Sequence, residues 1–281
     1  MEESKMKTLR RIFRHPMFTV GLIIFLSVMV VAIFADYIAP RTYREMDMQN
    51  AFQPPSLEHP FGTDNYGRCL FSRVVYGSRI ALRVGLIVVG IQGFLGIGLG
   101  LIAGYYGGVI DRLISFLADV SWSMPPMVFA MAIIMALGPS LDNVIISIAI
   151  VSWAEMARVV RSKTQSVKST AYVEAARAIG RTDSGIMMRH ILPNIMSPII
   201  VLVTLALPLA ILSTTALSFL GLGAQPPAPD WGVILNEGID FVQRAPWISI
   251  FPGLALVYTV LGFNMLGIGL RDILDPQLLD A

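Results

Sequence analysis

The sequence contains few charged residues and a single cysteine. Asp, Glu, Lys and Arg make up 14% of the 281 residues, whereas a soluble globular domain carries about a quarter. Together with a mean hydropathy of +0.68, this shortage excludes an ordinary soluble domain and indicates an integral membrane protein. Cys69 alone cannot build a disulfide framework or a cysteine-based zinc site. The net charge of +2 is too small to indicate a nucleic-acid partner.

Motifs for enzyme chemistry are also missing. The histidines, His15, His59 and His190, fall in different predicted segments, and neither HExxH nor GxSxG occurs. No lysine follows a glycine, so the chain has no P-loop with which to bind and cleave ATP. We therefore expect no catalytic residues, no metal site and no cofactor bound by this chain.

Long apolar runs predict an all-α membrane protein with about six transmembrane helices. A basic segment, 1–16, precedes the first span, 17–38, which is too long for a signal-peptide core and lacks a small-residue cleavage site. The polar, turn-rich segment 39–79 predicts an external loop. The core, 80–270, holds five more spans and a polar loop at 155–193, and residues 271–281 form a tail. The expected core spans are 80–105, 113–137, 141–153 with an extension to about 160, 195–220 and 246–270.

Three features within the spans predict how the helices pack. Gly96, Gly100 and Gly104 recur every fourth residue and form a smooth stripe for close helix contact. Pro125-Pro126 removes backbone donors and predicts a bend. Asp119 is costly in lipid, so we expect it near the headgroups or facing neighbouring helices.

The distribution of basic residues predicts the orientation. The N-terminal segment and the 155–193 loop are rich in Lys and Arg, which favours a cytoplasmic location for both termini and for that loop. The 39–79 segment is also basic, so the bias is modest.

The polar interruption at 174–193, EAARAIGRTDSGIMMRHILP, predicts two short helices joined by a glycine turn. Helical spacing places Tyr172, Ala175, Ala176 and Ile179 on one face. Gly180 fits a C-terminal cap with positive φ. Thr182, Asp183 or Ser184 can cap the second helix, and Pro193 marks the start of the next segment. These features predict an exposed helical hairpin.

The hairpin sequence, EAA followed by three residues, Gly and a later LP, resembles the coupling motif of bacterial ABC importer permeases. Three further blocks, at 59–82, 217–238 and 246–276, resemble the peptide-importer branch, so the likeness covers most of the chain. The chain thus resembles the C-type permeases of dipeptide, oligopeptide and nickel importers. Four positions depart from the family pattern: Cys69 and Ile268 replace the usual aspartates, His190 replaces an isoleucine, and Gln277 replaces a basic residue. Trp231, in the 217–238 block, suits an external loop at the membrane interface.

The resemblance implies a set of partners in the bacterial cytoplasmic (inner) membrane. They are a second homologous permease subunit, two ATP-binding-cassette ATPase subunits that act on ATP and Mg²⁺, and an extracytoplasmic substrate-binding protein. The resemblance implies that the hairpin enters a cleft of an ATPase subunit. The coupling residues are then Glu174, Ala175, Ala176, Arg177, Gly180 and Asp183.

Polar residues in the last two spans are candidates for the translocation path: Ser213, Thr214, Thr215 and Asn264. The three hydroxyls can equally bond to the carbonyl one turn back in their own helix. Peptides are the first choice of substrate, and glutathione-like peptides, nickel or metallophores remain alternatives. A gradient-driven carrier, with Asp119 and Asn264 as its few ionisable or polar intramembrane groups, and a scaffold without transport are the other classes.

Overall fold

The computed structural model describes residues 15–274. Within this range the chain is helical, without a β-strand beyond the isolated bridge between Thr63 and Cys69. The longer helices are α2 (Pro16–Ile33), α4 (Leu70–Tyr106), α5 (Gly108–Trp122), α6 (Pro126–Leu137), α7 (Leu141–Val167), α10 (Met196–Phe219) and α12 (Trp247–Leu274). The shorter elements are α3 (Ala35–Ile38), η1 (Met48–Asn50), α8 (Ala171–Ala178), α9 (Asp183–Ile186), η2 (Met187–Ile191), η3 (Leu192–Ile195), α11 (Trp231–Gly238) and η4 (Ile239–Phe241).

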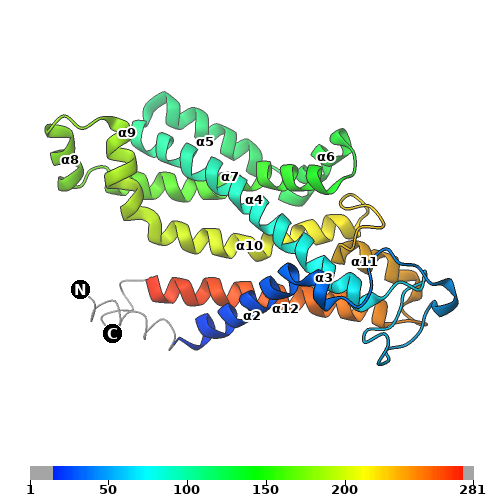
Figure 1. Ribbon diagram of the computed structural model, residues 1–281. Coiled ribbons are helices and arrows are strands. Elements are labelled where there is room, and N and C mark those ends of the chain that lie inside the picture. Colours follow the sequence, from blue (N-terminus) through cyan, green and yellow to red (C-terminus); the bar gives the residue numbers. More distant parts are fainter. Residues whose placement is uncertain (1–14, 275–281) are drawn as a thin grey trace.

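The long helices run antiparallel between two ends of the molecule. In Figure 1, α2, α5 and α10 run from the end that carries α8 to the end that carries α11, and α4, α7 and α12 run back. Five helices in the described part are long and apolar enough to cross a membrane, and the bent pair α5 and α6 makes up to six. The all-α fold with about six spans is thereby confirmed.

Helix α4 begins earlier than the sequence predicts. It starts at Leu70, so the loop expected over 39–79 is too long and the span expected from residue 80 too short. The sequence predicts a loop over residues 70–79 because this stretch contains the charged residues Arg73 and Arg79. Both arginines have carboxylate partners, Arg73 on Asp64 and Arg79 on Asp36, which allows these charges to sit on a helix.

Two other expected boundaries also differ. Helix α7 continues past the predicted end to Val167, and α12 continues to Leu274, so part of the predicted 271–281 tail is helical. The basic N-terminal segment up to residue 14 and residues 275–281 lie outside the described residues.

The glycine stripe on α4 contacts α7, as predicted. A Cβ added at Gly96 would lie 2.5 Å from the Cβ of Met156, and one at Gly100 would lie 2.6 Å from the carbonyl oxygen of Ala157. Both distances are shorter than any ordinary contact, so α7 can approach this closely only because the stripe lacks side chains.

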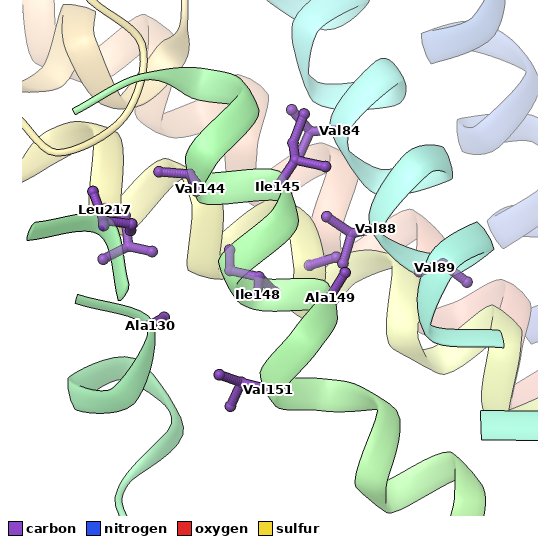
Figure 2. Close-up of a cluster of buried hydrophobic side chains, with 12 residues drawn as sticks. Val84, Val88, Val89, Ala130, Val144, Ile145, Ile148, Ala149, Val151 and Leu217 are labelled. Atoms are coloured by element: carbon purple, nitrogen blue, oxygen red, sulfur yellow. The ribbon is translucent and has the colours of Figure 1, made fainter. Parts of the chain in front are cut away.

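Beyond the stripe, branched side chains fill the space between α4 and α7. Figure 2 shows Val84 and Val88 of α4 facing Ile145 and Ala149 of α7. Leu217 of α10 belongs to the same buried cluster, which therefore joins α10 to this pair. The stripe and the cluster together hold the centre of the bundle.

The Pro-Pro pair breaks its span. Helix α5 ends at Trp122, α6 begins at Pro126, and their axes differ by 89°. Asp119 lies on α5 and forms an ion pair with Arg158 of α7 at 2.7 Å. Of the two expected positions for Asp119, the structure therefore supports the one that faces a neighbouring helix.

A cluster of four charges, three of them fully buried, braces the loop before α4. Asp64 accepts bonds from Arg68 Nε at 2.6 Å and from Arg73 Nη1 at 2.7 Å. Glu237 of α11 contacts the same two arginines at 2.8 and 2.7 Å. Two guanidinium groups thus balance two carboxylates. Cys69, which is buried beside them as the residue before α4, adds no charge to this balanced cluster.

Trp231 is buried inside the protein and belongs to a helix. It is the first residue of α11, only 3% exposed, and its Nε1 donates a hydrogen bond to the carbonyl oxygen of Val74 at 3.0 Å. Gly77 makes room for the indole, since a Cβ at this position would lie 2.4 Å from Nε1. The segment expected to be a loop is therefore helical from Trp231, and the ring anchors α11 on α4.

The buried carboxyl group of Asp230 predicts a pH-dependent stability. Asp230 caps α11 by accepting bonds from the N–H groups of Gly232 and Val233. These bonds favour the ionised form, but burial outweighs them and raises the pKa of Asp230 from 3.8 to about 6. The native state therefore binds this proton more tightly than the unfolded state does. Below pH 3.8 this difference contributes about 3 kcal/mol to the free energy of unfolding, and the contribution is lost as the pH rises through about 6.

Asp230→Asn keeps a good N-cap and has no ionisable group. We expect it to raise the thermal unfolding temperature of the purified protein in detergent more at pH 8 than at pH 5. The unfolding temperature of the variant is compared with that of the wild type at each pH, because other carboxylates also titrate and change both temperatures. An equal difference at both pH values would contradict the prediction.

Candidate functional site

The predicted hairpin is present and lies at the α8 end of the bundle (Figure 1). Gly180 ends the first helix with φ +78°. The N–H of Arg181 bonds back to the carbonyl oxygen of Ala176 at 3.2 Å, as in a Schellman cap. Thr182 then caps α9, where its Oγ1 accepts a bond from Gly185 N. The predicted glycine turn and N-cap are confirmed.

The second helix of the hairpin is not a separate short helix. Helices α9, η2, η3 and α10 follow one another without a break, and residues Asp183–Phe219 form one continuous span. Pro193 lies inside this run, although it was expected to mark a boundary. A π-helical turn, η2, changes the hydrogen-bond register just before Pro193, so the missing N–H leaves the helix intact. The hairpin is therefore rigidly joined to α10.

The predicted apolar face of α8 is divided between two directions. Val173 and Ala176 are buried, at 0% and 4% exposure, and pack with side chains of α4, α7 and η2. Tyr172, Ala175 and Ile179 point away from the protein. Ala176 is thus a core residue and not part of the exposed surface.

The remaining predicted coupling residues form an exposed surface. Glu174, Ala175, Arg177, Gly180 and Asp183 are all exposed. Large apolar side chains lie between these polar groups: Ile179 is 79% exposed and Met188 59%. A surface that combines exposed apolar side chains with charges is typical of a protein interface.

Tyr105, at the end of α4, attaches the hairpin to the bundle. Its hydroxyl donates to Oδ1 of Asp183 at 2.6 Å, and the guanidinium of Arg177 lies 5.8 Å from its ring centre. Lys168 Nζ bonds to the Tyr105 carbonyl oxygen at 3.1 Å. The Tyr105 hydroxyl raises the pKa of the Arg177 guanidinium, and the nearby charges of Asp183 and Glu174 add smaller contributions. No sequence pattern marks Tyr105, because its partner Asp183 is 78 residues away.

A second set of side-chain bonds at this end of the bundle joins α5 to α7. Arg161 of α7 holds Asp111 of α5 through two bonds, one of them between Nη2 and Oδ2 at 2.7 Å. Side-chain bonds at the hairpin end of the bundle therefore join α4 to α9 and α5 to α7, and α9 continues into α10.

Ser213 is the predicted path residue that lines the cavity between α4, α7 and α10. This cavity has a volume of about 270 Å³. Thr214 is buried and donates to the carbonyl oxygen of Ala210 at 2.9 Å, which is the alternative bond foreseen for these hydroxyls. Thr215 is buried, and Asn264 lies on α12, away from the cavity lining.

Sequence patterns did not single out the other polar residues of this cavity. They are Gln92 of α4 and Ser152 and Glu155 of α7. In the described part of the chain, no three His, Cys, Asp or Glu side chains are placed to hold a metal ion.

Comparisons with known proteins agree with this architecture. Residues 96–280 match the family model of binding-protein-dependent transport system inner membrane components, and residues 6–55 match the N-terminal transmembrane domain of oligopeptide transport permease C.

Similar proteins are alike over nearly their whole length. The chain is 47% identical to the dipeptide transport system permease protein DppC of Alkalihalophilus pseudofirmus, with 96% of this chain and 88% of that protein aligned. It is 45% identical to the glutathione transport system permease protein GsiD of Escherichia coli, over 96% and 89%. It is 41% identical to a putative peptide transport system permease protein of Brucella abortus, over 96% and 91%. The chain therefore belongs to the family of binding-protein-dependent transport system inner membrane components, as a multi-pass, C-type permease subunit of an ABC importer.

Proposed function

We propose that this chain forms half of the translocation pathway for dipeptides or oligopeptides and couples it to ATP hydrolysis in separate ATPase subunits. The complete importer has this chain, a second homologous permease, two ATPase subunits and an extracytoplasmic binding protein. The observation that carries the proposal is the exposed hairpin, with Glu174, Ala175 and Ile179 facing outward on a base that is fastened to the spans.

The coupling role follows from how the hairpin is held. Its outer surface is free for a partner, while Asp183 and Arg177 contact Tyr105 on α4 and α9 continues into α10. An ATPase subunit that moves when ATP binds can therefore displace two spans through one contact surface. Ala176, buried within the chain, supports α8 from behind.

In the proposed orientation, the hairpin meets a cytoplasmic ATPase, and the α8 end of the bundle is therefore the cytoplasmic end. Helix α2 begins and α12 ends on the same side of the bundle in Figure 1, which supports a cytoplasmic side for both of these helix ends. The loop before α4 and α11 then face the binding protein on the other side.

Peptides are the substrate class that the relatives favour. The similar proteins are named for dipeptides, peptides and glutathione. Nickel is not favoured by these names. A gradient-driven carrier loses one of its two expected intramembrane groups, because Asp119 is paired with Arg158.

The proposal is tested by purifying this chain in mild detergent and identifying the proteins that accompany it by mass spectrometry. We expect a second permease and P-loop ATPases, and vanadate-sensitive ATPase activity in the preparation. Proteoliposomes with the complex, the binding protein and internal ATP should take up a labelled dipeptide. Uptake by the chain alone, driven by an ion gradient without nucleotide, would overturn the proposal.

A further inference from the structure

We propose that the cavity between α4, α7 and α10 is a binding site for the positively charged end of the substrate, with Glu155 as its recognition group. The inference rests on the proposed transport function and deepens it, because it names the chemical group that the path recognises. A peptide presents a free ammonium group at its N-terminus. The observations that carry the proposal are the position of Glu155, its lack of a cation, and the other groups that line the cavity.

Glu155 lies well inside a span. It follows Leu141, the first residue of α7, by a helical distance of about 21 Å. A carboxylate at such a depth is costly in lipid, and it is tolerated where it faces water, a partner charge or a ligand. The Glu155 side chain lines the cavity and is exposed in this chain.

The neighbouring cations on α7 are already paired with other carboxylates. Arg158, one turn further along, bonds to Asp119 at 2.7 Å, and Arg161 is held by Asp111. Within residues 15–274, Glu155 has no ion pair and no side-chain hydrogen bond, and neither does it belong to a buried network. Its negative charge is therefore free to attract a cation that enters the cavity.

The rest of the lining suits a peptide. Gln92, only 6% exposed, has no intramolecular partner in the described part of the chain, so its amide can bond to a peptide group. Ser152 donates its proton to the carbonyl oxygen of Ile148 at 2.7 Å and keeps its acceptor positions. Leu202 and Leu205 offer an apolar wall for side chains. The volume of about 270 Å³ is near the lower limit of roughly 300 Å³ for small-molecule sites.

Cysteine labelling tests the charge of the cavity without requiring transport. In the purified complex, Cys69→Ala removes the one native thiol of this chain, and Ser152→Cys places a new thiol one helical turn from Glu155, so that labelling is followed on this subunit alone. The rate of reaction with a cationic thiol reagent is divided by the rate with a neutral reagent of similar size. We expect this ratio to fall about tenfold when Glu155→Gln is added, because one nearby charge is lost. Glu155→Asp should keep the ratio.

An unchanged ratio in the Glu155→Gln background would overturn the proposal. If Ser152→Cys prevents folding, Ser213→Cys on α10 reports on the same cavity from the opposite wall. A dipeptide with a free N-terminus should slow the labelling by the neutral reagent in the presence of Glu155, and an N-acetylated dipeptide should not. Equal protection by the two dipeptides would also contradict recognition of the ammonium group.

Transport provides a second readout. In proteoliposomes with saturating loaded binding protein, we expect Glu155→Gln to reduce the amount of peptide imported per ATP hydrolysed several-fold, while the ATPase rate is retained. Glu155→Asp should restore most of the peptide imported per ATP hydrolysed, because it keeps the negative charge. A merely structural role of Glu155 does not predict this recovery. Loss of the second permease from the Glu155→Gln complex would overturn the proposal by showing that Glu155 pairs across the subunit interface. If the wild-type complex imports no peptide, the proposed function fails, whereas the labelling result still decides whether the cavity attracts cations.

Discussion

Replacing Glu174 by Lys, or Gly180 by Asp, is expected to abolish ATP-dependent transport and leave membrane insertion intact. Both residues are exposed on the hairpin, so neither change disturbs the buried face formed by Val173 and Ala176. Glu174→Lys reverses a charge on the surface that meets the ATPase, where charged hydrogen bonds are partly desolvated and strong. The measurement is uptake of a labelled dipeptide by proteoliposomes that contain the complete complex. We expect a loss of at least about 100-fold, which corresponds to about 3 kcal/mol of coupling free energy.

Milder variants at the same positions separate charge from shape. Glu174→Gln removes the charge and keeps the size, so it should retain partial transport. Gly180 has φ +78°, and no atom lies within 4 Å of a Cβ added there. Asn tolerates this conformation and is nearly identical in shape to Asp, so Gly180→Asn should be far more active than Gly180→Asp. Wild-type uptake by Glu174→Lys and by Gly180→Asp would refute the coupling assignment.

Replacing Arg73 by Met is expected to destabilise the fold by about 3–5 kcal/mol, the usual effect of breaking a buried ion pair. Arg73 is fully buried and its Nη1 lies 2.7 Å from both Asp64 and Glu237. Without it, two carboxylates share the single cation of Arg68. Thermal unfolding in detergent, together with the fraction of the protein that runs as a folded monodisperse species, measures the loss.

A second substitution tests whether the loss is electrostatic. Glu237→Gln restores the charge balance in the Arg73→Met background, so the double variant should be more stable than the sum of the single effects predicts. Strict additivity of the two free energies would contradict a shared charge cluster. Arg83→Met is a matched control, because Arg83 also lies on α4, is 62% exposed and pairs with the exposed Asp142. Its effect should stay below about 1 kcal/mol.

Local sequence was sufficient for the features that depend on neighbouring residues. The apolar runs predicted the all-α fold and its spans, and the Gly96, Gly100 and Gly104 stripe predicted the close packing of α4. Gly180 and Thr182 predicted the turn and the cap of the hairpin, because a positive φ and an N-cap bond involve only a few consecutive residues. The ATPase-coupling role of this hairpin stays a prediction.

The tertiary structure alone decided which side chains meet across the bundle. Helical periodicity predicted that Ala175 and Ala176 share one exposed face of the hairpin. In the structure α8 packs against α4 and α7, and this packing buries the side chain of Ala176. The start of α4 depends on Arg68 and Arg73 reaching Glu237, a partner 169 residues from Arg68. Arg158 could have paired with Glu155 one turn away and instead bonds to Asp119, 39 residues away. Hydropathy and backbone capping are set by adjacent residues, whereas the partner of a buried or intramembrane charge is set by how distant helices pack. Within residues 15–274, this packing leaves Glu155 without a paired cation.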